Sequence, residues 1–234
     1  MAGKTTKKAE KGPGILLKGY LFLYNFAQVL GWSYIFYLIL EYYFVPTSHE
    51  NLWESVKFAL IIFQNAAVLE IIHAALRFVP SNVMITTFQV LSRVMAVCGV
   101  LIPFEESQKS IGLLLLLFAW TITEIIRYSY YAVNIVGNVP YFIIWCRYTF
   151  FIVLYPIGVT GELISLYYAQ ESVAHSKLWT VEMPNYLNVT FSYRYFLLFT
   201  MFLYLPLFPQ MYLHMFSQRR KIIGGEPSKK AKTK

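Results

Sequence analysis

The sequence predicts an all-α integral membrane protein, built as a bundle of six transmembrane helices. The first observation behind this prediction is composition: of 234 residues, 57% are hydrophobic and only 14% are charged, against roughly 25% charged in soluble domains. The second is that crossing the hydrocarbon takes about 20 mostly apolar residues in a helix. Six stretches meet this requirement, at 17–40, 57–77, 83–103, 111–133, 141–168 and 194–216.

The fifth stretch differs from the others because it is too long for one simple straight span. It also contains Pro156, Gly158 and Gly161. Proline removes a helical hydrogen bond, and its ring crowds the preceding turn. We therefore expect the fifth helix to be interrupted there by a kink or a partly unwound turn.

An even number of spans places both chain termini on one side of the membrane. The chain carries a formal charge of +8, and its Lys and Arg residues concentrate in the tails at 1–16 and 217–234. Positive residues favour the cytosolic side, so we expect both termini to be cytosolic, flanking one transmembrane domain at 17–216. Nucleic acid is not an expected partner, because the basic residues do not line one amphipathic face.

Two short motifs bear on location. The final residues 230–234, KAKTK, are typical of a dilysine retrieval signal of endoplasmic reticulum proteins, or of an ordinary basic tail. The loop near 169–193 is expected on the outer side and contains the glycosylation sequon Asn188-Val189-Thr190, close to the next span.

Metal and cofactor chemistry is not expected. The two cysteines, Cys98 and Cys146, lie inside apolar runs, and no Cys/His cluster has zinc spacing. The sequence also contains no nicotinamide or flavin fingerprint. We therefore predict no cofactor and no metal.

Seven ionisable side chains fall inside the predicted spans. A charge exposed near the middle of a bilayer costs about 2.5–3.5 kcal/mol, so these residues cannot all face lipid. We expect them to pair inside the bundle or to surround a wet cavity, either as structural contacts between helices or as a site. They are Glu70, His73, Arg93, Glu124, Arg127, Arg147 and Glu162.

The fifth span carries the most informative pattern. Tyr148, Tyr155 and Glu162 recur every seven residues and share one face of an ideal helix. A tyrosine on a helix is usually a packing residue, but a partly buried carboxyl group is suited to acid–base work. In a straight helix the Cα atoms of Tyr155 and Glu162 would be about 10.5 Å apart. We therefore expect the interruption of the helix to bring the phenol and the carboxyl group together.

These residues are embedded in longer runs that resemble a known family, the very-long-chain (3R)-3-hydroxyacyl-CoA dehydratases, also called the protein tyrosine phosphatase-like A family. The similarity covers roughly residues 13–222. The runs that carry it are RYT at 147–149 with YPIGVTGE at 155–162, WTITEIIRY at 120–128, the region from LEI at 69–71 to FQVLSR at 88–93, and FPQ at 208–210.

The resemblance implies a six-span enzyme of the endoplasmic reticulum membrane that performs the third step of fatty-acid elongation. It would remove water from (3R)-3-hydroxyacyl-CoA and give trans-2-enoyl-CoA, without a cofactor. The partners it implies are the condensing enzymes, the 3-ketoacyl-CoA reductase and the enoyl-CoA reductase. It places catalysis at Tyr155 and Glu162, with substrate-binding or supporting roles at Glu70, Gln89, Arg93 and Arg147.

Elimination requires a base for the C2 proton and an acid for the departing C3 oxygen. We assign the base to Glu162 and the acid to Tyr155, with Arg93 or Arg147 tuning the site; the two roles could be exchanged or shared through water. Two other function classes remain open from the sequence: a catalytically silent scaffold for elongation enzymes, and a channel or transporter.

Overall fold

Helices make up nearly all regular structure in the part of the chain that is described. The computed structural model describes residues 14–46, 51–186 and 188–224, so most of the basic tails and the dilysine-type motif lie outside the described residues. The only other regular feature in these ranges is a single antiparallel bridge between Val181 and Phe191. The predicted helical class is confirmed for this part of the chain.

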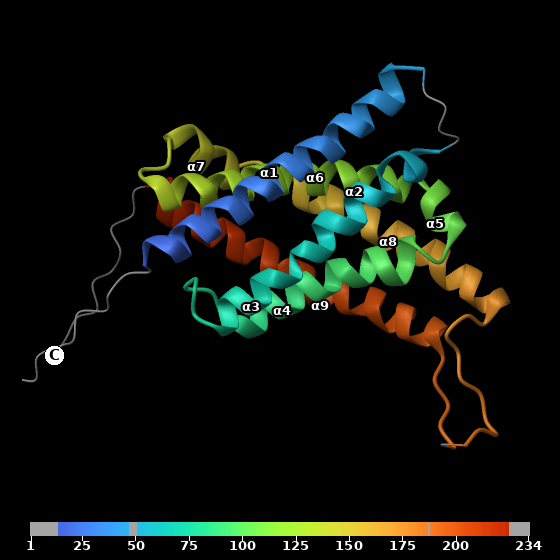
Figure 1. The fold of residues 1–234 in the computed structure, drawn as a ribbon. Helices are drawn as coiled ribbons and strands as arrows, with labels where there is room; N and C mark the ends of the chain where they lie inside the picture. Colours follow the sequence, from blue (N-terminus) through green and yellow to red (C-terminus); the bar gives the residue numbers. More distant parts are fainter. Residues whose placement is uncertain (1–13, 47–50, 187, 225–234) are drawn as a thin grey trace, which may run out of the picture.

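Six of the helical segments are long and apolar enough to cross a membrane. Two of the crossings are composite, because α2 continues into α3 and α4 continues into the π-helix η1. The remaining short helices, α5 and α7, lie between crossings (Figure 1). The elements are α1 (Ile15–Phe44), α2 (Leu52–Ala66), α3 (Val68–Ala75), α4 (Val83–Val94), η1 (Met95–Leu101), α5 (Glu105–Lys109), α6 (Ile111–Val136), α7 (Tyr141–Arg147), α8 (Phe151–Ser176) and α9 (Tyr193–Ile222).

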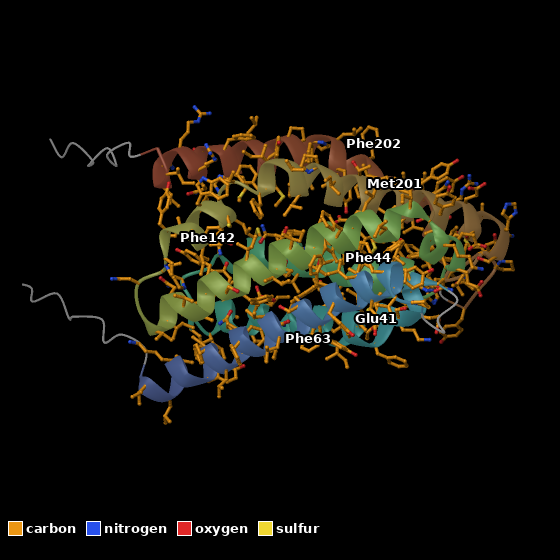
Figure 2. All side chains as sticks on the ribbon, turned by 90° about the horizontal axis from the view of Figure 1, so that it is seen from above. Glu41, Phe44, Phe63, Phe142, Met201 and Phe202 are labelled. Atoms are coloured by element: carbon orange, nitrogen blue, oxygen red, sulfur yellow. The ribbon has the colours of Figure 1, made fainter. Side chains whose placement is uncertain are left out.

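Helix α6 is the centre of the bundle, and α9 is at its edge. Figure 2 shows α9, α8, α6 and α1 side by side in that order. In the most apolar window of α6, 50% of the residues are buried inside the protein, against 6% in α9. The main core joins α1, α2, η1 and α6 through large side chains such as Trp32, Leu60, Val97 and Leu117. Helix α9 therefore contacts the rest of the molecule mainly through α8.

Both described ends of the chain lie at the same end of the bundle (Figure 1). This is the arrangement that an even number of crossings produces. The loop at 177–192 and α5 lie at the opposite end. Exposed Asn188, in the sequon, belongs to that loop.

The predicted interruption of the fifth helix at Pro156 is not confirmed. Helix α8 is continuous from Phe151 to Ser176, and the break falls earlier, in the turn at 148–150 that separates α7 from α8. A proline nitrogen cannot donate to the carbonyl four residues before it, which here belongs to Ile152. The Tyr212 hydroxyl donates to that carbonyl at 2.8 Å, so the oxygen keeps a partner and the helix continues.

The glycines of α8 have a different role from the one we expected. A Cβ atom on Gly161 would lie 2.5 Å from the backbone nitrogen of Leu116, and one on Gly112 would lie 2.8 Å from the Gly161 oxygen. A Cβ atom on Gly158 would lie 3.2 Å from the Cβ atom of Ala119. Small residues on both helices thus let the backbones of α6 and α8 approach closely. This close approach places the middle of α8 against the polar face of α6.

Candidate active site

Glu162, near the middle of α8, is held by two hydrogen-bond donors from different helices. The indole Nε1 of Trp120, on α6, donates to Oε1 at 2.8 Å. The hydroxyl of Tyr204, on α9, donates to Oε2 at 2.5 Å. Each carboxyl oxygen therefore has its own donor, and the carboxyl group is fixed between the helices on either side of α8.

Tyr155 lies two turns before Glu162 on α8. It packs against α9, the helix whose Tyr204 binds Glu162. Its ring stacks on Phe208, with centroids 5.3 Å apart, and on Tyr212, with centroids 6.0 Å apart. Its hydroxyl makes no hydrogen bond to any residue within the described ranges, so it is available to a ligand. Tyr155 also lies close enough to Glu162 to interact with it electrostatically.

The predicted common face is confirmed only in part. Tyr155 and Glu162 both contact α9, but Tyr148 lies in the turn before α8 and contacts the Arg147 guanidinium instead. In the described part of the chain no direct hydrogen bond joins Tyr155 to Glu162. The two groups share a face of a continuous helix, where we had expected a broken helix to bring them together.

A network of four charges lies beside this pair, with Glu124 buried and the other three side chains partly buried. Arg127 donates to both Glu70 oxygens, at 2.7 and 3.0 Å, and to Glu124 at 2.7 Å. Glu124, only 1% exposed, also pairs with Arg93. The predicted pairing of intramembrane charges is confirmed for these residues. The Tyr128 hydroxyl donates to Glu70 as well.

Arg93 links the charge network to Glu162. Its guanidinium lies over the Trp120 ring, 5.5 Å from the ring centroid. A cation over an indole face is attracted by the negative face of the ring. Since the same indole donates to Glu162, the orientation of Trp120 is set by the charge network on one side and by the carboxylate on the other.

The other two sequence-predicted supporting residues lie elsewhere. Arg147 packs over Tyr130 and Tyr131, 4.4 and 4.8 Å from the ring centroids, and donates to the Tyr131 hydroxyl at 3.2 Å. One of its terminal nitrogens is buried and has no partner in the described chain. The Gln89 side chain is exposed, and no hydrogen bond joins it to another described residue.

Sequence reasoning missed three residues that surround the pair. Trp120 and Tyr204 bind Glu162, while Tyr212 stacks on Tyr155 and holds the Ile152 carbonyl. One signal was present: Tyr204, Phe208 and Tyr212 recur every four residues and so share a face of α9. Nothing in the sequence indicated which helix that face would meet.

Two surface hollows of the molecule lie away from this pair. One, of about 330 Å³, is an apolar groove between α6 and α8, lined by residues such as Phe118, Ile122 and Val153. The other, of about 700 Å³, lies at the end opposite the chain termini and carries Glu105, Glu106 and Glu171. Within the described residues no group of three or more His, Cys, Asp or Glu side chains is arranged to hold a metal ion.

The family comparison decides how this arrangement is interpreted. The sequence model of the protein tyrosine phosphatase-like protein family, PTPLA, matches residues 64–225. This range contains both members of the pair and all four charges of the network. The chain belongs to this family.

Curated relatives in the family extend over nearly the whole chain. Very-long-chain (3R)-3-hydroxyacyl-CoA dehydratase 2 of Mus musculus is 44% identical over 217 residues, covering 93% of this chain and 85% of that protein. The dehydratase hpo-8 of Caenorhabditis elegans is 45% identical and covers 90% of this chain and 97% of that protein. The dehydratase PASTICCINO 2 of Arabidopsis thaliana is 35% identical, covering 90% and 95%. No solved structure matches the chain.

Proposed function

We propose that this chain is a very-long-chain (3R)-3-hydroxyacyl-CoA dehydratase, a hydro-lyase of fatty-acid elongation. The observation that carries the proposal is the combination of family membership with the pair in α8. There, a carboxyl group is held by two donors, and a phenol with an unengaged hydroxyl packs on the same side of the helix. Relatives at 35–45% identity bear the dehydratase name.

The pair supplies the two proton transfers that the elimination needs. Glu162, as the carboxylate, takes the proton from C2, and the electron pair of the C–H bond forms the C2–C3 double bond. Tyr155 donates its proton to the C3 oxygen, which leaves as water. One turnover thus leaves a protonated Glu162 and a Tyr155 phenolate, and moving one proton from the first to the second resets the enzyme.

The four-charge network supports this chemistry from a distance. Arg93 lies over the Trp120 ring and so helps to hold the indole that donates to Glu162. Glu70 acts through Arg127 and is a supporting residue. We retain Gln89 and Arg147 as candidates for substrate contact, because one is exposed and the other has an unpartnered buried nitrogen.

The orientation we propose has both termini in the cytosol and the protein in the endoplasmic reticulum membrane. The chain-terminal end carries the basic residues Lys18, Arg77, Arg219, Arg220 and Lys221. The opposite end has a more acidic set, with Glu41, Glu54, Glu105, Glu106, Glu171 and Glu182 against Lys57, Lys109, Lys177 and Arg194. This asymmetry follows the positive-inside rule. Association with the condensing enzymes and reductases of elongation is part of the same proposal.

This orientation also gives the pair a depth that suits a CoA thioester arriving from the cytosol. Helix α8 starts at Phe151, on the side facing the chain ends, with α7 lying farther toward those ends. At about 1.5 Å per residue, Tyr155 lies about 10 Å closer than Glu162 to the chain-terminal end along the helix axis. The phenol is therefore nearer the proposed cytosolic side than the carboxylate.

The decisive experiment incubates purified protein with (3R)-3-hydroxyacyl-CoA and measures trans-2-enoyl-CoA. We expect turnover by the wild type and at least a hundredfold loss in Glu162→Gln and in Tyr155→Phe, in the range typical of removing an acid or base. Matched controls on the same helix are Glu171→Gln and Tyr167→Phe, both at exposed positions, which should keep wild-type rates. A folded wild type without turnover would favour the scaffold, and ion or solute flux in proteoliposomes would favour a channel.

A further inference from the structure

The two oxygens of the Glu162 carboxyl group are chemically different in this structure. Oε1 accepts from the Trp120 indole, which can only donate. Oε2 faces the Tyr204 hydroxyl, which can donate or accept. The inference that follows rests on the proposed function of Glu162 and concerns how its proton is controlled.

This difference fixes where a proton on Glu162 resides. A carbonyl oxygen accepts a hydrogen bond better than the hydroxyl oxygen of a carboxylic acid, so the N–H of Trp120 favours the acid form with Oε1 as the carbonyl. The proton then lies on Oε2. Tyr204 donates to the carboxylate before the C2 proton is taken, and it can accept from the acid afterwards by rotating its O–H.

Tyr204 also lies beside the second proton-transfer group. It is one helical turn from Phe208, whose ring stacks on Tyr155 with an interplanar angle of 8°. Tyr204, Phe208 and Tyr212 share one face of α9, and Tyr155 stacks on the last two of them. Tyr204 thus contacts the group that gains a proton during turnover and shares a helix face with the rings that hold the group that loses one.

We propose that Trp120 and Tyr204 form a clamp on Glu162, in which Trp120 fixes the carboxyl orientation and Tyr204 moves the proton from Glu162 toward Tyr155 between turnovers. The transfer balances, since Tyr204 receives one proton from Oε2 and releases its own, which passes through a water molecule to the Tyr155 phenolate. This proton replaces the one that Tyr155 gave to the departing oxygen. Trp120 acts through Glu162 and is a positioning residue, whereas Tyr204 exchanges a proton with Glu162.

The test compares Tyr204→Phe and Trp120→Phe with the wild type. We expect kcat to fall about tenfold to a hundredfold in each variant, the range for one hydrogen bond to a charged group, with KM within about threefold of wild type. For Tyr204→Phe we expect a larger solvent deuterium isotope effect on kcat, because resetting the proton becomes slower. A merely structural residue would lower the melting temperature without changing the isotope effect.

The matched control is Tyr195→Phe, an exposed tyrosine on the same helix, which should leave kcat and the isotope effect unchanged. If Tyr204→Phe keeps the wild-type kcat and isotope effect while Glu162→Gln is inactive, the clamp is wrong and the dehydratase assignment stands. If the wild type itself produces no enoyl-CoA, the proposed function fails first. Full activity in Glu162→Gln would overturn both.

Discussion

Replacing Glu124 by glutamine tests whether the buried charge network holds the bundle together. Glu124 is the shared acceptor for Arg93 and Arg127, and it is almost fully buried. The network contains two carboxylates and two guanidinium groups, so it is neutral. Glu124→Gln keeps the side-chain shape but leaves one uncompensated positive charge among Glu70, Arg93 and Arg127.

The expected loss of stability can be estimated from that uncompensated charge. Removing one partner of a buried ion pair costs about 3–5 kcal/mol. For a chain of this size, each 1 kcal/mol shifts the melting temperature by roughly 2–4 °C, so we expect a decrease of roughly 6–20 °C. The measurement is the fraction of detergent-solubilised protein that remains monodisperse after heating, which does not depend on activity.

Two comparisons make the result interpretable. Glu54→Gln removes a more exposed pair with Lys57, which is worth at most about 1 kcal/mol and should shift the melting temperature by only a few degrees. Arg93→Gln combined with Glu124→Gln restores neutrality and should recover part of the loss. If Glu124→Gln lowers the melting temperature no more than Glu54→Gln does, the network stabilises the protein no more than a surface ion pair, and the reasoning is wrong.

Three further predictions follow from packing. Gly161→Ala places a methyl group against the backbone of α6, so it should destabilise the protein by about 1–3 kcal/mol and lower turnover. Gly19→Ala has open space around the new methyl group and should change neither quantity. Thermal unfolding measures the stability, and the dehydration assay measures the turnover. Tyr212→Phe leaves the Ile152 carbonyl without its donor, so we expect about 1–3 kcal/mol of destabilisation, and unchanged melting would contradict this. Arg147→Lys keeps the charge but loses the planar group stacked on two tyrosines, and a two- to threefold increase in KM for acyl-CoA is expected from steady-state kinetics.

The sequence predicts the helices of this fold well because each span must form its own backbone hydrogen bonds and present apolar side chains to the hydrocarbon. A span needs enough consecutive apolar residues whatever its neighbours are, and the predicted stretch at 111–133 overlaps closely with α6 (Ile111–Val136). The fifth span shows the limit of this approach. The apolar run at 141–168 continues through the turn at 148–150, so composition alone could not locate the break.

The site was predictable only as far as local spacing reaches. The prediction that ionisable residues in the spans pair inside the bundle is confirmed for Glu124 and Arg127 of α6. By contrast, Trp120 and Tyr204 each lie 42 residues from Glu162, on either side of it in the chain. Helical periodicity says which residues share a face and does not say which faces meet. The expected interruption at Pro156 is not confirmed, and the sequence could not show that a hydroxyl from another helix binds the carbonyl freed by proline.

Helix α9 lies at the edge of the bundle and also holds the carboxyl group of Glu162. Only Tyr193 and Leu197 of this helix are buried, and its main neighbour is α8. Yet it supplies one of the two donors to Glu162 and the aromatic surface on which Tyr155 rests. If α9 moved outward to admit a long lipid-like chain from the bilayer, the Glu162 carboxylate would lose the hydrogen bond from Tyr204. Glu162 therefore has both of its hydrogen-bond donors only while α9 is packed against α8.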